Sequence, residues 1–190
     1  MCFYITATLP NKTDLDKIRT TLDQFEMAFI PLNNDSVSSQ LTTGDLYLRA
    51  TKSYCDCGTI LGSLNRQNEY QTLLNSKKVK TLRKKKWTDK EIDNWIKQKL
   101  QNKKQKKGGH LTTFETKEEL KRWNLFIQTI LTSQSSKYIG ILKHWYAGGL
   151  TDEKINLKEI QRINLNKVTP EFLLNIEEDV LYEFYLPFRS

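Results

Sequence analysis

One segment of this chain, residues 77–107, carries a net positive charge larger than that of the whole protein. It contains 14 Lys or Arg and 3 acidic residues, a net charge of +11, against +8 for all 190 residues. The rest of the chain holds 16 basic and 19 acidic side chains. The chain is therefore a mildly acidic domain that bears one concentrated cationic module, not a uniformly basic protein. We therefore expect a lysine-rich helical insertion at 77–108, and a single α+β domain formed by 1–76 together with 109–190.

The composition restricts the class of protein to a soluble one with free cysteines. No run of about 18 apolar residues exists, which excludes a membrane-spanning helix. The N-terminus lacks the charged, apolar and small-residue regions of a signal peptide. Three cysteines, an odd number, do not make a disulfide framework. These features predict a cytoplasmic protein with no membrane partner.

The order of extended and helical patterns predicts an α+β fold with a mostly antiparallel sheet packed with helices. Residues 2–9 are β-branched and aromatic and end at Pro10, as a strand does. The other expected strands are 36–41 paired with 46–50 as a hairpin, 137–146, and 180–186. Helices are expected after Thr13 or Asp14, after a capping box formed by Thr116 and Glu119, over 152–163, and from Thr169-Pro170 onward.

The basic segment contains the signals of a helix over 88–102. Thr88 and Glu91 form a capping box, and Trp87 stands where a hydrophobic staple would pack against Ile92. An apolar stripe at helical spacing predicts that one face of this helix is buried, with both tryptophans in a core. The stripe consists of Ile92, Trp95, Ile96 and Leu100.

The lysines of this segment indicate a polyanion as the partner, most simply nucleic acid. Several Lys or Arg at short spacing suit a phosphate backbone, and 13 Lys against 1 Arg favour charge attraction over the reading of base edges. Binding is therefore expected to tolerate many sequences. An acidic protein surface, docked by an interaction or inhibitor protein, and a merely solvated helix face are the alternatives. The candidate nucleic-acid-binding residues are Lys84, Lys85, Lys86, Lys97, Lys99, Lys103, Lys104, Lys106 and Lys107.

A second local feature is the turn Cys55-Asp56-Cys57-Gly58, expected to lead into a helix. A thiolate near helix amides is favoured by the helix dipole, so the alternative function is a thiol-dependent enzyme with Cys57, Cys55 and His144 as catalytic candidates. Cys2, on the first strand, is placed to reach the pair. The simplest role for Cys2 and one of the pair is that of a small buried apolar residue.

Metal and cofactor motifs give no further candidate. The three thiols with His110 or His144 match a zinc ligand set in composition, but one C-x-C pair with distant partners lacks the spacing of paired C-x-x-C motifs. The acidic run at 177–179 is expected to face water. No Walker-type loop, G-x-G-x-x-G, G-x-S-x-G or H-E-x-x-H motif is present. The sequence therefore predicts neither a metal site nor a cofactor.

Overall fold

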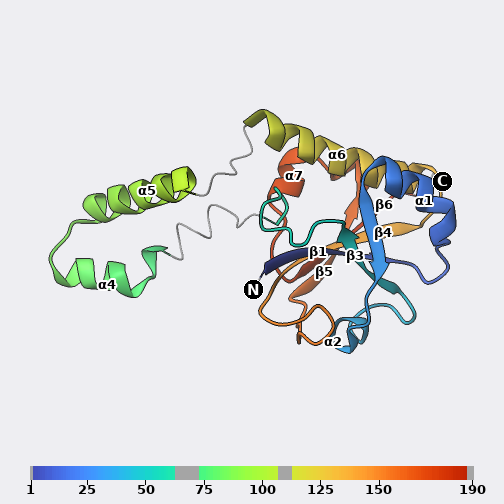
Figure 1. The fold of residues 1–190 in the computed structure, drawn as a ribbon, viewed down its shortest axis with the longest axis horizontal. Coiled ribbons are helices and arrows are strands. Elements are labelled where there is room, and N and C mark those ends of the chain that lie inside the picture. The colour runs from blue at the N-terminus through green and yellow to red at the C-terminus, as the bar shows by residue number, and fades with distance from the viewer. Residues whose placement is uncertain (1, 63–72, 107–112, 188–190) are drawn as a thin grey trace. The chain divides into compact units, whose positions relative to one another are not determined.

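The structure is a computed structural model that describes residues 2–62, 73–106 and 113–187. The chain divides into two compact units, one formed by Met1–Ser63 with Thr113–Ser190 and the other by Leu64–Thr112. Each unit is described by itself. The larger unit contains the sheet, and the smaller one contains two basic helices (Figure 1).

A six-stranded sheet forms the centre of the larger unit. Its strands are β1 (Cys2–Leu9), β2 (Met27–Pro31), β3 (Leu46–Thr51), β4 (Tyr138–Tyr146), β5 (Glu159–Asn164) and β6 (Val180–Tyr185). They lie in the order β2-β3-β1-β4-β6-β5. Every neighbouring pair is antiparallel except β5 and β6. The α+β prediction with a mostly antiparallel sheet is confirmed.

Three helices supply the apolar side chains that cover one face of this sheet. They are α1 (Leu15–Gln24), α6 (Thr113–Thr132) and α7 (Pro170–Leu174). Alternate residues of β1, such as Ile5 and Ala7, point toward them and join the same buried cluster because side chains alternate along a strand. Phe126 of α6 is fully buried there.

The opposite face of the sheet carries a smaller core. Tyr47 and Tyr146 are buried on it, and their hydroxyl groups lie 2.8 Å apart. Val37, from the short helix α2 (Asp35–Ser38), and Ile155 complete this cluster. Because α2 and the chain around Ile155 supply only one buried side chain each, this face is covered more thinly than the helical one.

Several expected helix starts are confirmed, and three local predictions are wrong. Asp14 and Thr169 cap α1 and α7 through their side chains. Residues 36–41 do not form a hairpin strand, because the side chain of Asn34 accepts from the Val37 amide and starts α2. The expected helix over 152–163 is replaced by β5, which hydrogen-bonds to β6 as a parallel edge strand.

The predicted Thr116–Glu119 capping box is the third error. Helix α6 begins at Thr113, so Thr116 lies inside it. Glu119 instead accepts a hydrogen bond of 2.9 Å from the backbone amide of Ile60. Its carboxylate therefore anchors the turn after the cysteines rather than a helix start.

The smaller unit contains α4 (Lys77–Lys84) and α5 (Asp89–Lys106), which pack through a small core of their own. The predicted helix over 88–102 is confirmed, and so is its capping box: the Thr88 amide donates to Glu91 at 2.7 Å, and the Glu91 amide donates to Thr88 at 3.3 Å. Four side chains from the two helices are buried together: Val79, Leu82, Ile92 and Ile96. Trp95 and Leu100 are partly buried against them. Within the described residues, no helix is long and apolar enough to cross a membrane.

Candidate functional site

Among the described residues of the smaller unit, helix α4 and the turn after it form a concentrated run of exposed cations. Residues 77–86 contain seven Lys or Arg and no acidic residue. All seven are exposed, because the two apolar residues Val79 and Leu82 point inward to α5. The core of the two-helix unit therefore orients the charges toward solvent.

The lysines selected from the sequence differ in their surroundings. Lys84, Lys85 and Lys86 are exposed at the end of α4. Lys97 pairs with Asp93 at 2.7 Å, and the Lys99 ammonium lies 4.8 Å from the centre of the Trp95 ring. Both of these cations thus have a partner within their own helix. Lys103, Lys104 and Lys106 belong to α5, and Lys107 lies outside the described residues.

Lys77, Lys78 and Lys80 are not among the candidate residues selected from the sequence. These residues are exposed on α4, within the basic segment but before the lysine run at 84–86. The helical pattern over 77–84 is weak in the sequence, because only two apolar residues, Val79 and Leu82, mark the buried face of this helix. A capping serine, Ser76, which accepts from the Val79 amide at 3.3 Å, could have identified that helix.

The expectation that both tryptophans are core residues is half wrong. Trp95 is partly buried in the small core, whereas Trp87 is 39 % exposed. The Trp87 amide donates to the Leu82 carbonyl at 3.2 Å, which holds its backbone against the end of α4. Trp87 thus follows the exposed lysines 84–86 in the chain and is itself exposed.

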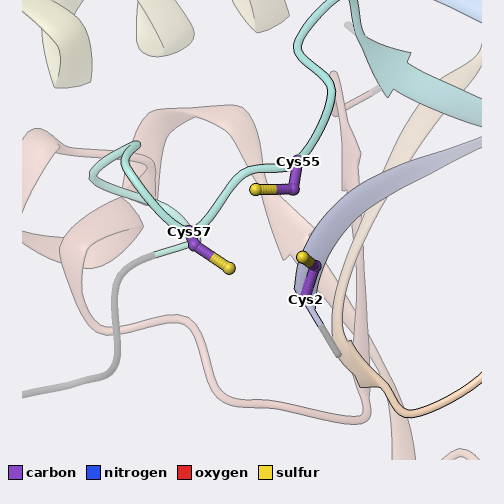
Figure 2. Close-up of side chains that lie close together, drawn as sticks. All are labelled: Cys2, Cys55 and Cys57. Atoms are coloured by element: carbon purple, nitrogen blue, oxygen red, sulfur yellow. The ribbon is translucent and has the colours of Figure 1, made fainter.

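The second candidate site is formed by the three cysteines, which converge in the larger unit (Figure 2). One sulphur atom comes from strand β1 and two from the turn after β3, and all three lie within 4.8 Å of one another. Cys2 therefore reaches the pair, as its position on the first strand suggested. None of the three is fully buried: Cys2 and Cys55 are partly exposed and Cys57 is exposed. The prediction of buried apolar thiols is wrong.

Strand β1 positions the turn through its free edge. Strand β3 pairs with β1 only at Thr6–Leu9, so the amides of Phe3 and Ile5 need other acceptors. Ile5 donates to the Asp56 carboxylate at 2.8 Å, and Phe3 donates to the Cys57 sulphur at 3.1 Å. The Asp56 amide donates back to the Phe3 carbonyl at 2.9 Å. The Cys-Asp-Cys segment thus continues the pairing where β3 has ended.

Buried contacts hold the middle of this turn. Asp56 is fully buried, and its carbonyl accepts from both the amide and the hydroxyl of Thr59 at 2.9 Å. A Cβ atom at Gly62 would lie 2.0 Å from that carbonyl oxygen. The close approach of Gly62 and Asp56 requires glycine, because any side chain there would overlap the backbone.

The surroundings change the acidities of the site in different directions. The backbone amide of Cys57 donates to the Cys55 sulphur and lowers the pKa of that thiol. The hydrogen bond between Cys2 and Cys55, together with burial, raises the pKa of Cys2. Burial raises the pKa of the Asp56 carboxyl, and the hydrogen bond from the Ile5 amide opposes this rise. Since the thiolate is the reactive form of cysteine, these directions predict that Cys55 reacts more readily than Cys2.

We expect Cys55 to be alkylated before Cys2 in the native, metal-free protein. Its lowered pKa means that the thiolate forms at lower pH than in a free cysteine, whereas Cys2 requires a higher pH. Iodoacetamide labelling across a pH series, mapped by mass spectrometry, measures both rates. The denatured protein is the control, in which the two cysteines should titrate alike. Identical pH profiles in the native protein would contradict this assignment.

The expected pairing of Cys57 with His144 is not supported by the contacts of His144. Its Nδ1 atom lies 2.5 Å from Asp179, and its Nε2 atom is buried without a described partner. His144 groups instead with Glu178 and Asp179, within 4.8 Å. Glu178 accepts from the Trp145 amide at 3.0 Å. The two acids, expected to face water, are partly buried here and support β4.

A cavity of about 340 Å³ is lined in part by residues just before and just after the cysteine turn. Thr59 and Ser53 contribute to its wall, together with Glu119 and Arg122 of α6. None of the three cysteines lines it. The cavity therefore offers no substrate pocket around the sulphur atoms. His110, the other possible ligand in the sequence, lies outside the described residues.

Comparisons with protein families, with curated proteins and with solved structures gave no match for this chain.

Proposed function

We propose that this protein binds nucleic acid with little sequence preference through α4 and the turn that follows it. The observation that carries the proposal is the run of seven exposed Lys or Arg at 77–86 without an acidic residue. A row of this kind attracts a phosphate backbone and releases its counterions. Within 77–86, only Arg83 has a described ion-pair partner, Asp89, at 3.6 Å.

Two further features support a nucleic-acid partner over a featureless anion. Trp87 is exposed beside Lys84–Lys86, and an accessible indole can stack on an unpaired base. The small core of α4 and α5 gives the lysines a folded platform, so that less side-chain and backbone freedom is lost on binding than in a disordered tail. The exposed tryptophan and the folded platform suit single strands as well as duplexes.

The composition also favours a cytoplasmic location.

A thiol-dependent enzyme receives less support. Cys55 has the lowered pKa that a nucleophile needs, but within the described residues no hydrogen bond joins His144 to a cysteine, and the neighbouring cavity is lined by other residues. Nucleophilic catalysis requires a base within hydrogen-bond reach of the thiol. An acidic protein could bind the same lysine surface. The following test distinguishes that partner from nucleic acid.

The binding constant for DNA and RNA should fall steeply with salt. If about five lysines contact phosphates on a duplex, the plot of log affinity against log salt has a slope of about −4 to −5. Replacing Lys78, Lys80, Lys84 and Lys85 by Gln should bring that slope to about −1, because each lost contact removes about 0.9. Fluorescence anisotropy with labelled duplex and single strands measures it.

The matched control carries the same number of Lys→Gln changes in the larger unit. Lys12, Lys137, Lys154 and Lys167 are exposed there, so the control variant has the same net charge and should retain the slope of the parent. Absence of binding at low salt, or equal slopes for the two variants, would overturn the proposal. An acidic protein would then be the partner to seek.

A further inference from the structure

The convergence of three cysteines is unrelated to the lysine surface and calls for its own explanation. These cysteines are the only ones in the chain, and they come from segments separated by more than fifty residues. Their sulphur atoms nevertheless lie within 4.8 Å of one another (Figure 2). Thiolate sulphur is the ligand that zinc, copper(I) and iron–sulphur centres prefer.

The spacing of the sulphur atoms fits one metal ion. A Zn–S bond of about 2.3 Å and tetrahedral angles place ligand sulphurs about 3.8 Å apart. The sulphur atoms now lie within 4.8 Å of one another, so each needs to move by only about 1 Å or less to reach that spacing. The side chains alone can supply such shifts, because Cys57 is exposed and Cys2 and Cys55 are partly exposed.

The surroundings of the sulphur atoms are those of a metal-thiolate site. The Phe3 amide donates to Cys57 at 3.1 Å, and the Cys57 amide donates to Cys55. Backbone N–H groups directed at sulphur orient metal-bound thiolates and stabilise their charge. Buried Asp56 fixes the backbone between the two cysteines, so the pair is preorganised before an ion arrives.

We propose that Cys2, Cys55 and Cys57 bind one Zn²⁺ ion as three thiolate ligands, with the fourth position open to solvent. Exposed Cys57 leaves the site accessible to water, which zinc accepts as a fourth ligand in open sites. The site is independent of nucleic-acid binding. Failure of one proposal leaves the other standing, since no lysine of residues 77–86 contributes to the zinc site.

Metal titration of the full-length reduced protein tests this site. Co²⁺ should give an intense thiolate-to-cobalt charge-transfer band that saturates at one ion per chain, and Zn²⁺ should displace it. Each of Cys2→Ser, Cys55→Ser and Cys57→Ser should lower zinc affinity by about tenfold or more, at least as much as the loss of an outer partner does. Circular dichroism checks that each variant is folded.

A measurement on the unmodified protein keeps the test independent of these variants. Saturating Zn²⁺ should slow alkylation of all three cysteines together, and a chelator should restore it. Absence of the cobalt band, zinc affinity unchanged in Cys57→Ser, or one zinc shared by two chains would each overturn the proposal. Binding of Cu⁺ without binding of Zn²⁺ would overturn the choice of zinc.

Discussion

Replacing Phe126 by alanine should lower the free energy of unfolding of the larger unit by about 3–5 kcal/mol. The ring is fully buried on α6 and lies 5.6 Å from Phe25, 5.5 Å from Phe29 and 6.0 Å from Trp123, between ring centres. Its removal loses apolar burial and leaves a cavity that these rigid neighbours cannot fill. Urea denaturation followed by circular dichroism measures the change.

The adjacent residue provides a matched control for this prediction. Leu125 is on the same helix and is 53 % exposed, so Leu125→Ala should change the free energy of unfolding by no more than about 0.5 kcal/mol. The transition of the smaller unit, whose described core residues include none of α6, should stay unchanged in both variants. Similar losses for Phe126→Ala and Leu125→Ala would contradict the role of Phe126 as a core residue.

The confirmed parts of the fold are those whose signals are local and strong. Strand β1 is a continuous β-branched and aromatic run, and α5 begins with a capping box followed by an apolar stripe. Such features depend on neighbours within about one turn or one strand of the same chain. They were therefore readable from the sequence without knowledge of the sheet.

The errors arose where distant contacts decide the local structure. The segment 159–164 is polar enough for an exposed helix, yet its backbone pairs with β6 and makes it an edge strand. In the same way, Glu119 has the spacing of a capping residue but bonds to Ile60, 59 positions away in the chain. Pairing of this kind overrides intrinsic preference, and no local pattern reports it.

The cysteine site shows the same limit more sharply. The C-x-C spacing fails as a zinc motif because it supplies only two ligands. The third thiol, Cys2, lies near this pair because β3 ends early and leaves the free edge of β1 to the turn. The basic surface, by contrast, follows directly from composition, and only the helix register that exposes Lys77, Lys78 and Lys80 required the structure.

Replacing Gly62 by alanine should destabilise the larger unit by about 1–3 kcal/mol, the usual cost of overpacking. The added Cβ would lie 2.0 Å from the carbonyl oxygen of Asp56 and 2.6 Å from its carbonyl carbon. Both are backbone atoms, so relief requires the chain to move rather than a side chain to rotate. The moving residue is the one between Cys55 and Cys57, and its carbonyl also accepts two hydrogen bonds from Thr59.

The displacement at Asp56 should therefore reach the sulphur atoms. We expect Gly62→Ala to weaken the bond from Phe3 to Cys57, to remove the difference in alkylation between Cys55 and Cys2, and to lower the affinity for Co²⁺. Gly58→Ala is the matched control, because a Cβ atom at Gly58, next to Cys57 in the chain, would meet nothing within 4 Å. If urea denaturation and thiol labelling gave the same results for both variants, the packing of Gly62 against Asp56 would not be what holds the cysteines together.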